Sequence, residues 1–114
     1  MSTILISLPL EPDSVSVAYK EYVFNHLIAV MLSILLPVYN CSCVALVTEL
    51  QRQCVECGTE FEIIVADDGS SVASYTEHNL RIERLDGVRY ITRKQNVGRS
   101  AIRNFLISQA QGEW

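Results

Sequence analysis

The sequence predicts an α/β fold in which helices cover a parallel sheet. Two short apolar runs, residues 32–36 and 61–66, are bounded by turn residues, a pattern typical of strands buried on both faces. A third β-rich run covers residues 88–92, and helical or weakly patterned segments follow the runs. Strands that alternate with helices need crossover connections, which place the strands parallel and the helices on both faces of the sheet.

The ends of the first strand and of the helix after it are marked by Pro37 and Gly58. Pro37 has no N–H, so we expect it to end the hydrogen-bonded ladder, and Tyr39 and Asn40 suit a loop at the carboxyl end of the strand. A helix over residues 44–57 is predicted by one apolar stripe: Val47, Leu50, Cys54 and Cys57. Gly58 then fits the left-handed position that ends many helices.

The later elements differ in how strongly they are patterned. Residues 71–85 have a weak pattern that predicts an irregular helix. Residues 99–111 predict a regular helix, with apolar side chains at three- and four-residue steps and Gly112 as its cap. Glu113 and Trp114 resemble the entry to a further strand.

Composition limits the classes of protein to which the chain can belong. Its 114 residues are 49% hydrophobic and 19% charged, which indicates one globular domain rather than a disordered chain. The net charge of −4 gives no electrostatic footprint for nucleic acid or for an anionic membrane surface. An anionic ligand must therefore be held by local donors.

The first thirty residues stand apart from the strand and helix alternation. They lack the basic region of an export signal, and the apolar stretch 22–38 contains Asn25 and His26 and ends at Pro37, short of a membrane span. Asp13 or Ser14 can cap a helix over residues 15–29. We expect residues 1–30 to be an N-terminal extension, helical or disordered, before a domain at residues 31–114.

Four cysteines form a C-x-C pair and a C-x2-C pair: Cys41, Cys43, Cys54 and Cys57. Four thiolates could complete a zinc site, but the segment between the pairs is helical and shorter than in usual zinc ribbons. A redox C-x2-C pair normally begins a helix, whereas Cys54 and Cys57 end one. We favour reduced thiols that pack as small apolar residues, as expected for a cytoplasmic protein.

Two adjacent carboxylates, Asp67 and Asp68, follow the second strand and precede Gly69. Ligands of open α/β sheets bind outside the carboxyl ends of the strands, so this pair faces an expected ligand crevice. The competing interpretation is a helix cap, for which aspartate and serine are preferred. The sequence has no G-x-G-x-x-G, no phosphate-binding G-x-x-x-x-G-K-[ST] and no G-x-S-x-G, which disfavours a nicotinamide-dependent enzyme, a P-loop protein and a serine hydrolase.

Three segments in fixed order carry a resemblance: SILLPVYN (33–40), EIIVADDGS (62–70) and NVGRSAIRNFLISQAQGEW (96–114). Together they resemble the N-terminal half of inverting family 2 glycosyltransferases with the Rossmann-like GT-A fold. The resemblance covers residues 31–114, which implies a parallel sheet truncated after the third βα unit. Because it starts at Met31, that methionine is our expected natural start.

The resemblance implies a site for a nucleotide-diphospho-sugar, most simply a UDP-sugar, formed by Pro37, Val38, Tyr39, Asp67, Asp68, Asn96, Gly98 and Arg99. The first three would line the base, with the ring of Tyr39 available for stacking. Asp68 would accept a hydrogen bond from the base, such as uracil N3–H, and Asp67 would support the loop or the ribose. A glycine-containing turn that opens a helix directs N–H groups at the diphosphate, where Arg99 would add charge. Arg103 is as readily explained by a solvated helix face.

The chain departs from the family pattern at its C-terminal end. Family members continue into an Asp-x-Asp motif that binds Mg²⁺ or Mn²⁺ and later supply a general base, whereas this sequence contains no Asp-x-Asp. We therefore expect the metal only in a full-length enzyme of polysaccharide biosynthesis, bound by no residue of this chain, and no catalysis by the 114 residues alone. The alternative is a non-catalytic remnant that binds a partner or self-associates through its unfinished sheet.

Overall fold

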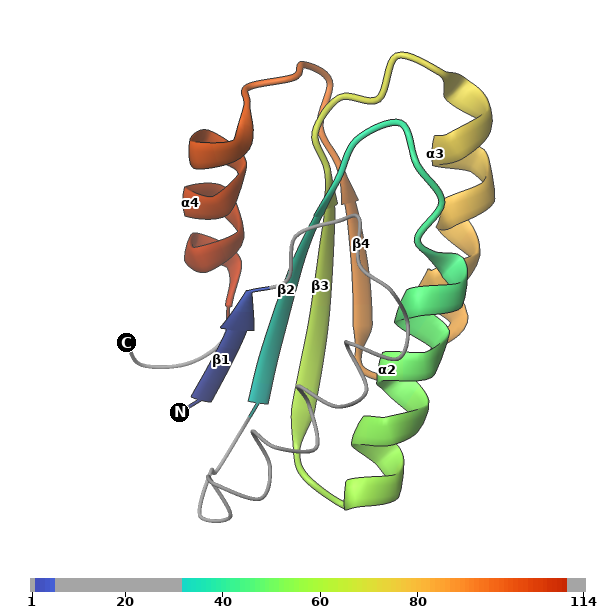
Figure 1. Ribbon diagram of the computed structural model, residues 1–114, viewed down its shortest axis with the longest axis vertical. Helices are drawn as coiled ribbons and strands as arrows, with labels where there is room; N and C mark the ends of the chain where they lie inside the picture. Colours follow the sequence, from blue (N-terminus) through green and yellow to red (C-terminus); the bar gives the residue numbers. More distant parts are fainter. Residues whose placement is uncertain (1, 6–31, 111–114) are drawn as a thin grey trace.

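The computed structural model describes residues 2–5 and 32–110 of the chain. They form one parallel sheet with the strand order β1-β2-β3-β4 and helices on both faces (Figure 1). The strands are β1 (Ser2–Leu5), β2 (Leu32–Val38), β3 (Phe61–Asp67) and β4 (Val88–Thr92). The helices are α2 (Val44–Cys57), α3 (Ala73–Asn79), the 3-10 helix η1 (Leu80–Arg84) and α4 (Arg99–Gln109). The predicted α/β fold is confirmed.

Two apolar cores lie on the two faces of the sheet. Successive side chains of a strand point to opposite faces, so Ile34 and Leu36 of β2 pack with α2, whereas Leu35 packs with Ile102 and Leu106 of α4. All residues of β3 after its first are buried, which confirms a strand covered on both faces. Of the described helices, α4 lies on one side of the sheet and α2 and α3 lie on the other (Figure 1).

β2 runs two residues farther than predicted, through Pro37 to Val38. The expectation that Pro37 ends the ladder is wrong. The Val38 carbonyl accepts a 2.8 Å hydrogen bond from the Asp68 N–H, so the backbone of Val38 faces β3. Backbone groups of successive residues in a strand point to opposite neighbours, so the backbone of Pro37 faces β1. In the described part of the chain β1 pairs only as far as Leu35, so no strand requires the N–H that Pro37 lacks.

The helices follow the sequence pattern except at their ends. α2 has the predicted bounds, and Gly58 after it has a φ of +69°. Cys57, predicted on the buried stripe, is exposed instead, because the last turn of α2 reaches beyond the start of β3 (Figure 1). The irregular helix predicted over residues 71–85 is confirmed as α3 followed by η1. α4 ends at Gln109, two residues earlier than predicted.

One strand is not anticipated by the sequence analysis, which assigned no strand to residues 1–30. β1 extends the sheet beside β2, in register from Ser2 with Leu32 to Leu5 with Leu35. The helix predicted over residues 15–29, the cap at Gly112 and the strand entry at residues 113–114 lie outside the described residues. None of the described helices is long and apolar enough to cross a membrane.

Candidate functional site

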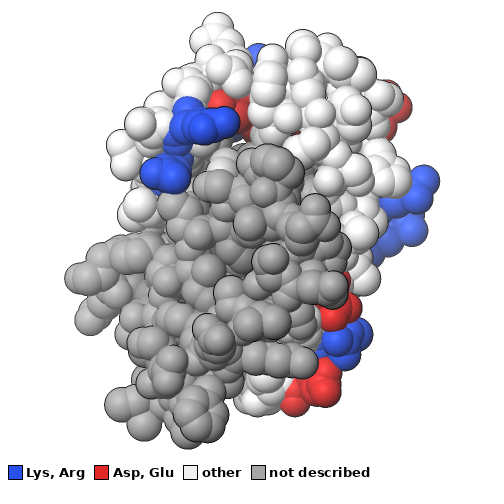
Figure 2. Space-filling view, in the orientation of Figure 1, with Lys and Arg blue, Asp and Glu red and all other residues white. Residues whose placement is uncertain are grey.

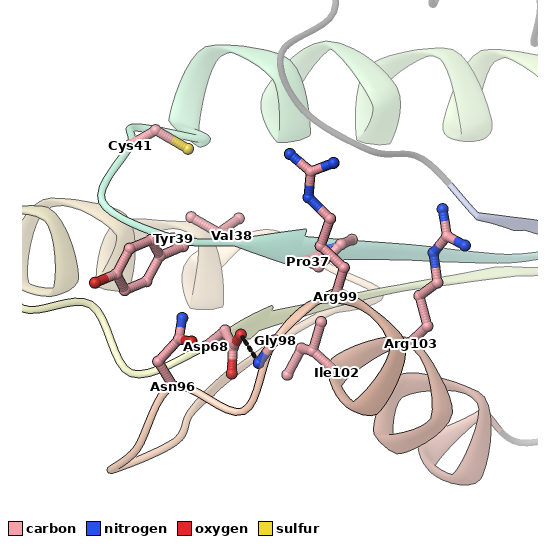
Figure 3. Close-up of a pocket in the computed structure, with 10 residues that line it drawn as sticks. All are labelled: Pro37, Val38, Tyr39, Cys41, Asp68, Asn96, Gly98, Arg99, Ile102 and Arg103. Atoms are coloured by element: carbon pink, nitrogen blue, oxygen red, sulfur yellow. Dashed lines mark hydrogen bonds between the residues drawn. The ribbon is translucent and has the colours of Figure 1, made fainter.

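The loops after β2, β3 and β4 meet the first turn of α4 at the carboxyl edge of the sheet (Figure 1). They enclose a cavity of about 680 Å³, called the edge pocket from here on. Its lining residues, shown in Figure 3, are Pro37, Val38, Tyr39, Cys41, Asp68, Asn96, Gly98, Arg99, Ile102 and Arg103. The edge pocket therefore lies where parallel α/β sheets bind ligands.

The structure brings together all of the site residues predicted from sequence except Asp67, which does not line the edge pocket. Arg103, for which the sequence left a solvated face equally open, does line it. The signal for Arg103 was its spacing of four residues from Arg99, which places both side chains on one side of a helix. Cys41 and Ile102 also line the pocket, and no sequence motif marked them.

The adjacent carboxylates Asp67 and Asp68 point to opposite faces of the sheet, as expected for consecutive residues at the end of a strand. Asp67 is 1% exposed and faces the α2 side. Its oxygens accept hydrogen bonds from the Ser70 N–H (2.7 Å), the Ser70 hydroxyl (2.6 Å) and the Tyr90 hydroxyl (3.4 Å). Asp67 therefore fixes the turn after β3 from inside the protein.

Asp68 faces α4 and connects two segments that are far apart in the sequence. One carboxylate oxygen accepts from the Val97 N–H (2.9 Å) and the other from the Gly98 N–H (3.1 Å), the latter drawn as a dashed line in Figure 3. These donors belong to the turn that leads into α4. Asp68 thus holds the start of α4 against the loop after β3, with the edge pocket beside the contact.

Gly69 allows the loop after β3 to approach the turn before α4 closely. Its φ is +71°, and a Cβ atom placed on it would lie 2.5 Å from the Asn96 nitrogen and 2.5 Å from the Gln95 carbonyl carbon. Both neighbours are backbone atoms, so they cannot move away as a flexible side chain can. The loop after β3 and the turn before α4 therefore touch backbone to backbone.

Replacing Gly69 with alanine is expected to separate this contact and to lower ligand affinity at the edge pocket several-fold. The added Cβ meets backbone and also strains a left-handed residue, for which we expect about 1–3 kcal/mol of lost stability. Urea unfolding and ligand titration would measure the two effects. Gly58→Ala is the matched control, because Gly58 also has a positive φ but has open space around it. Equal loss of ligand affinity in both variants would contradict the proposed contact.

Asn40 joins the loop after β2 to the loop after β3. Its φ of +48° is in the left-handed region, which asparagine tolerates. Its side chain donates to the Ser71 hydroxyl (2.9 Å) and accepts from the Val72 N–H (3.1 Å), while its own N–H donates to the Ser70 hydroxyl (2.9 Å). From the sequence, Asn40 was predicted to lie in a loop, with no further role. These long-range bonds could not be read from the sequence.

Positive charge gathers at the start of α4. Arg99 and Arg103 are exposed, rise from the same side of the helix in Figure 3, and form no ion pair within the part of the chain that the structure describes. Gly98, the N-cap residue of α4, has no side chain to accept a hydrogen bond from the first N–H groups of the helix. In Figure 2 basic side chains lie over α4, whereas acidic and basic side chains are mixed over α2. A helix N-terminus with two exposed arginines on one side is suited to an anion.

Two buried groups near the loops, the Cys43 thiol and the Tyr90 hydroxyl, have raised pKa values. Burial, and next the neighbouring Cys41 thiol, raise the pKa of the Cys43 thiol to about 12. Burial, and next the charge of Asp67, also raise the pKa of the Tyr90 hydroxyl. Both groups are therefore neutral at physiological pH and serve the packing beneath the loops.

Because the native pKa of Cys43 is raised, stability is expected to fall as the pH rises. The unfolded thiol loses its proton near pH 9.0 and the native thiol near pH 12, so between these values the unfolded state is favoured. The slope is at most about 1.4 kcal/mol per pH unit for one group. Urea unfolding at several pH values across this window would show it. Cys43→Ala should have a shallower slope, and an unchanged slope would contradict this assignment.

The described residues do not form a metal site. No group of three or more His, Cys, Asp or Glu side chains lies close enough together among them to hold a metal ion. Asp68 is the one carboxylate among the residues that line the edge pocket, and it is already bonded to two backbone N–H groups.

One of three comparisons with known proteins found a match. The family model described as glycosyl transferase family 2 matches residues 33–114, a range that includes every residue lining the edge pocket. The searches of curated proteins and of solved structures gave no match.

Proposed function

The chain belongs to glycosyl transferase family 2, and on this premise we propose that the edge pocket binds the nucleoside diphosphate of a nucleotide-sugar donor, with UDP as the nucleotide. The observation that carries the proposal is the junction at Asp68. This carboxylate joins the loop after β3 to the turn before α4, beside a cavity that also contains Arg99 and Arg103.

The base and ribose fit the side of the edge pocket formed by the loop after β2. Pro37 and Val38 present apolar surface, and the ring of Tyr39 is 48% exposed and available for stacking. An ionised carboxylate has about four acceptor positions, of which the two backbone N–H groups use two at Asp68. Asp68 can therefore accept a further hydrogen bond, such as that from uracil N3–H. A base without such a donor would bind less well.

The diphosphate fits the side formed by α4. The Gly98 N–H is bonded to Asp68, but the N–H groups of the first turn of α4 that follow it have no partner within the helix, and Arg99 and Arg103 add two charged donors one turn apart. In an active enzyme, negative charge would grow on the departing diphosphate, and these groups would stabilise it more as the sugar leaves. The same two arginines would also hold the donor in place before transfer.

This chain is proposed to bind the donor without transferring the sugar. Among the described residues that line the edge pocket, Asp68 is the one carboxylate, and the proposal assigns it to the base of the nucleotide rather than to the acceptor hydroxyl. We propose that the acceptor site, the general base and the metal site of an active enzyme lie outside the described residues.

Nucleotide titration followed by NMR would test the proposed function. UDP is expected to shift the amide signals of the edge pocket, with those of Tyr39, Val97 and Arg99 among the most affected. UMP, which lacks one phosphate, is expected to bind more weakly. Absence of any shift with UDP, GDP, CDP and ADP at millimolar concentration would reject nucleotide binding at this site.

Removing both arginines is expected to weaken UDP binding at least tenfold and to reduce its dependence on salt. Each charge-assisted contact to phosphate contributes about 1.5–3 kcal/mol when partly shielded from water, and exposure at the helix surface lowers that value here. UDP titration of Arg99→Ala/Arg103→Ala at two salt concentrations measures both effects. Arg81→Ala/Arg84→Ala is the matched control, because these exposed arginines lie on η1. Equal weakening by both double variants would indicate a nonspecific charge effect.

A further inference from the structure

The loop at residues 39–43 forms one side of the edge pocket, yet it has no regular structure of its own. It contributes Tyr39 and Cys41 to the pocket and then leads into α2. The residue before α2, Cys43, provides no side-chain cap for the helix. The position of this loop must therefore be set by residues elsewhere in the chain.

Asn40 anchors the start of this loop through its bonds to residues 70–72, and Asn79, the last residue of α3, anchors the end that leads into α2. The side chain of Asn79 is fully buried, and its amide oxygen accepts from the Cys43 N–H (3.0 Å) while its amide nitrogen donates to the Cys41 carbonyl (2.9 Å). One side chain thus satisfies a backbone donor and a backbone acceptor on either side of Ser42, as a neighbouring strand would. A side chain that only accepts or only donates cannot do this.

We infer that Asn79 is a positioning residue for the base side of the edge pocket, although it does not line the pocket itself. Together with the bonds of Asn40, the contacts of Asn79 to the Cys41 carbonyl and the Cys43 N–H set the path of the 39–43 loop, and with it the place of the Tyr39 ring. This inference rests on the proposed function, and it adds a residue that neither the motifs nor the family match singles out.

The base side and the diphosphate side of the edge pocket are held by different contacts. The α4 side is held by Asp68, which bonds to Val97 and Gly98 and not to the 39–43 loop. Loss of the Asn79 amide should therefore weaken contacts to the base and ribose and leave contacts to the diphosphate intact. A general loss of stability would weaken both.

The test is an NMR titration of wild type and Asn79→Leu with three probes: uridine, UDP and inorganic pyrophosphate. Leucine keeps the approximate size of asparagine and removes both hydrogen bonds. We expect uridine and UDP to bind at least fivefold more weakly and pyrophosphate to bind within twofold of wild type. If Asn79→Leu does not fold, the milder Asn79→Ser, which cannot span both backbone groups, is expected to show the same split.

Val88→Ala is the matched control for stability. Val88 is buried at the start of β4, at the end of the strand away from the edge pocket, and its truncation should leave all three affinities within twofold of wild type. Unchanged UDP binding in the Asn79 variant, or equal weakening of UDP and pyrophosphate, would overturn the positioning role alone. If wild type binds none of the probes, the proposed function itself fails and the inference fails with it.

Discussion

Asp68→Asn is expected to lower the affinity for UDP by about 10- to 100-fold while the protein stays folded. The substitution keeps the shape of the side chain but replaces one acceptor oxygen by an NH2 group. That group would face a backbone N–H of Val97 or Gly98, so one of the two bonds is lost and two donors oppose each other. A hydrogen bond to a charged group contributes about 1.5–3 kcal/mol, which sets the expected range of affinity.

Calorimetric or NMR titration with UDP would measure the loss, and amide hydrogen exchange at Val97 and Gly98 would report the freed turn. Asn104→Asp is a useful control, because it changes the net charge in the opposite direction at an exposed position of α4 that does not line the edge pocket. Asp68→Asn with wild-type affinity and unchanged exchange at these two amides would show that the Asp68 junction does not organise the site.

The sheet and its long helices could be predicted from the sequence because their signals are local. The apolar runs at β2 and β3, the stripe of α2 and the glycine after it each act over a few residues, and propensity and periodicity read such signals directly. Pro37 was misjudged because its effect depends on which neighbour its N–H would face. That neighbour is decided by strand pairing, which a single sequence does not state.

Part of the candidate site, its motif residues, could also be predicted because local signals predict the strands. Its motif residues gather at one edge because parallel strands end there, so knowing the strands was sufficient to bring them together. The contacts that join the loops could not be predicted, since Asn40, Asn79 and the Asp68 junction connect segments about thirty or more residues apart. The different tasks of two adjacent aspartates follow from strand alternation, which the sequence permits but does not require.

Asp67→Ala is expected to cause the largest loss of stability among the substitutions at this edge, about 2–4 kcal/mol. The carboxylate is buried and accepts hydrogen bonds from the Ser70 N–H, the Ser70 hydroxyl and the Tyr90 hydroxyl. Alanine leaves the Ser70 N–H, the Ser70 hydroxyl and the Tyr90 hydroxyl without this acceptor. The short bonds to Ser70 should account for most of the loss, because the bond to Tyr90 is long at 3.4 Å.

Urea unfolding of Asp67→Ala, Tyr90→Phe and the double variant would separate these contributions. Tyr90→Phe alone should cost about 0.5–1.5 kcal/mol, since it removes one hydroxyl and its hydrogen bonds. The double variant should lose less than the sum of the two single losses, because the phenylalanine no longer carries a hydroxyl that needs an acceptor. Strict additivity would show that the two side chains act independently. If Asp67→Ala lost less unfolding free energy than Asp68→Asn, the two roles would be contradicted. In those roles Asp67 stabilises the loop after β3 and Asp68 organises the ligand site.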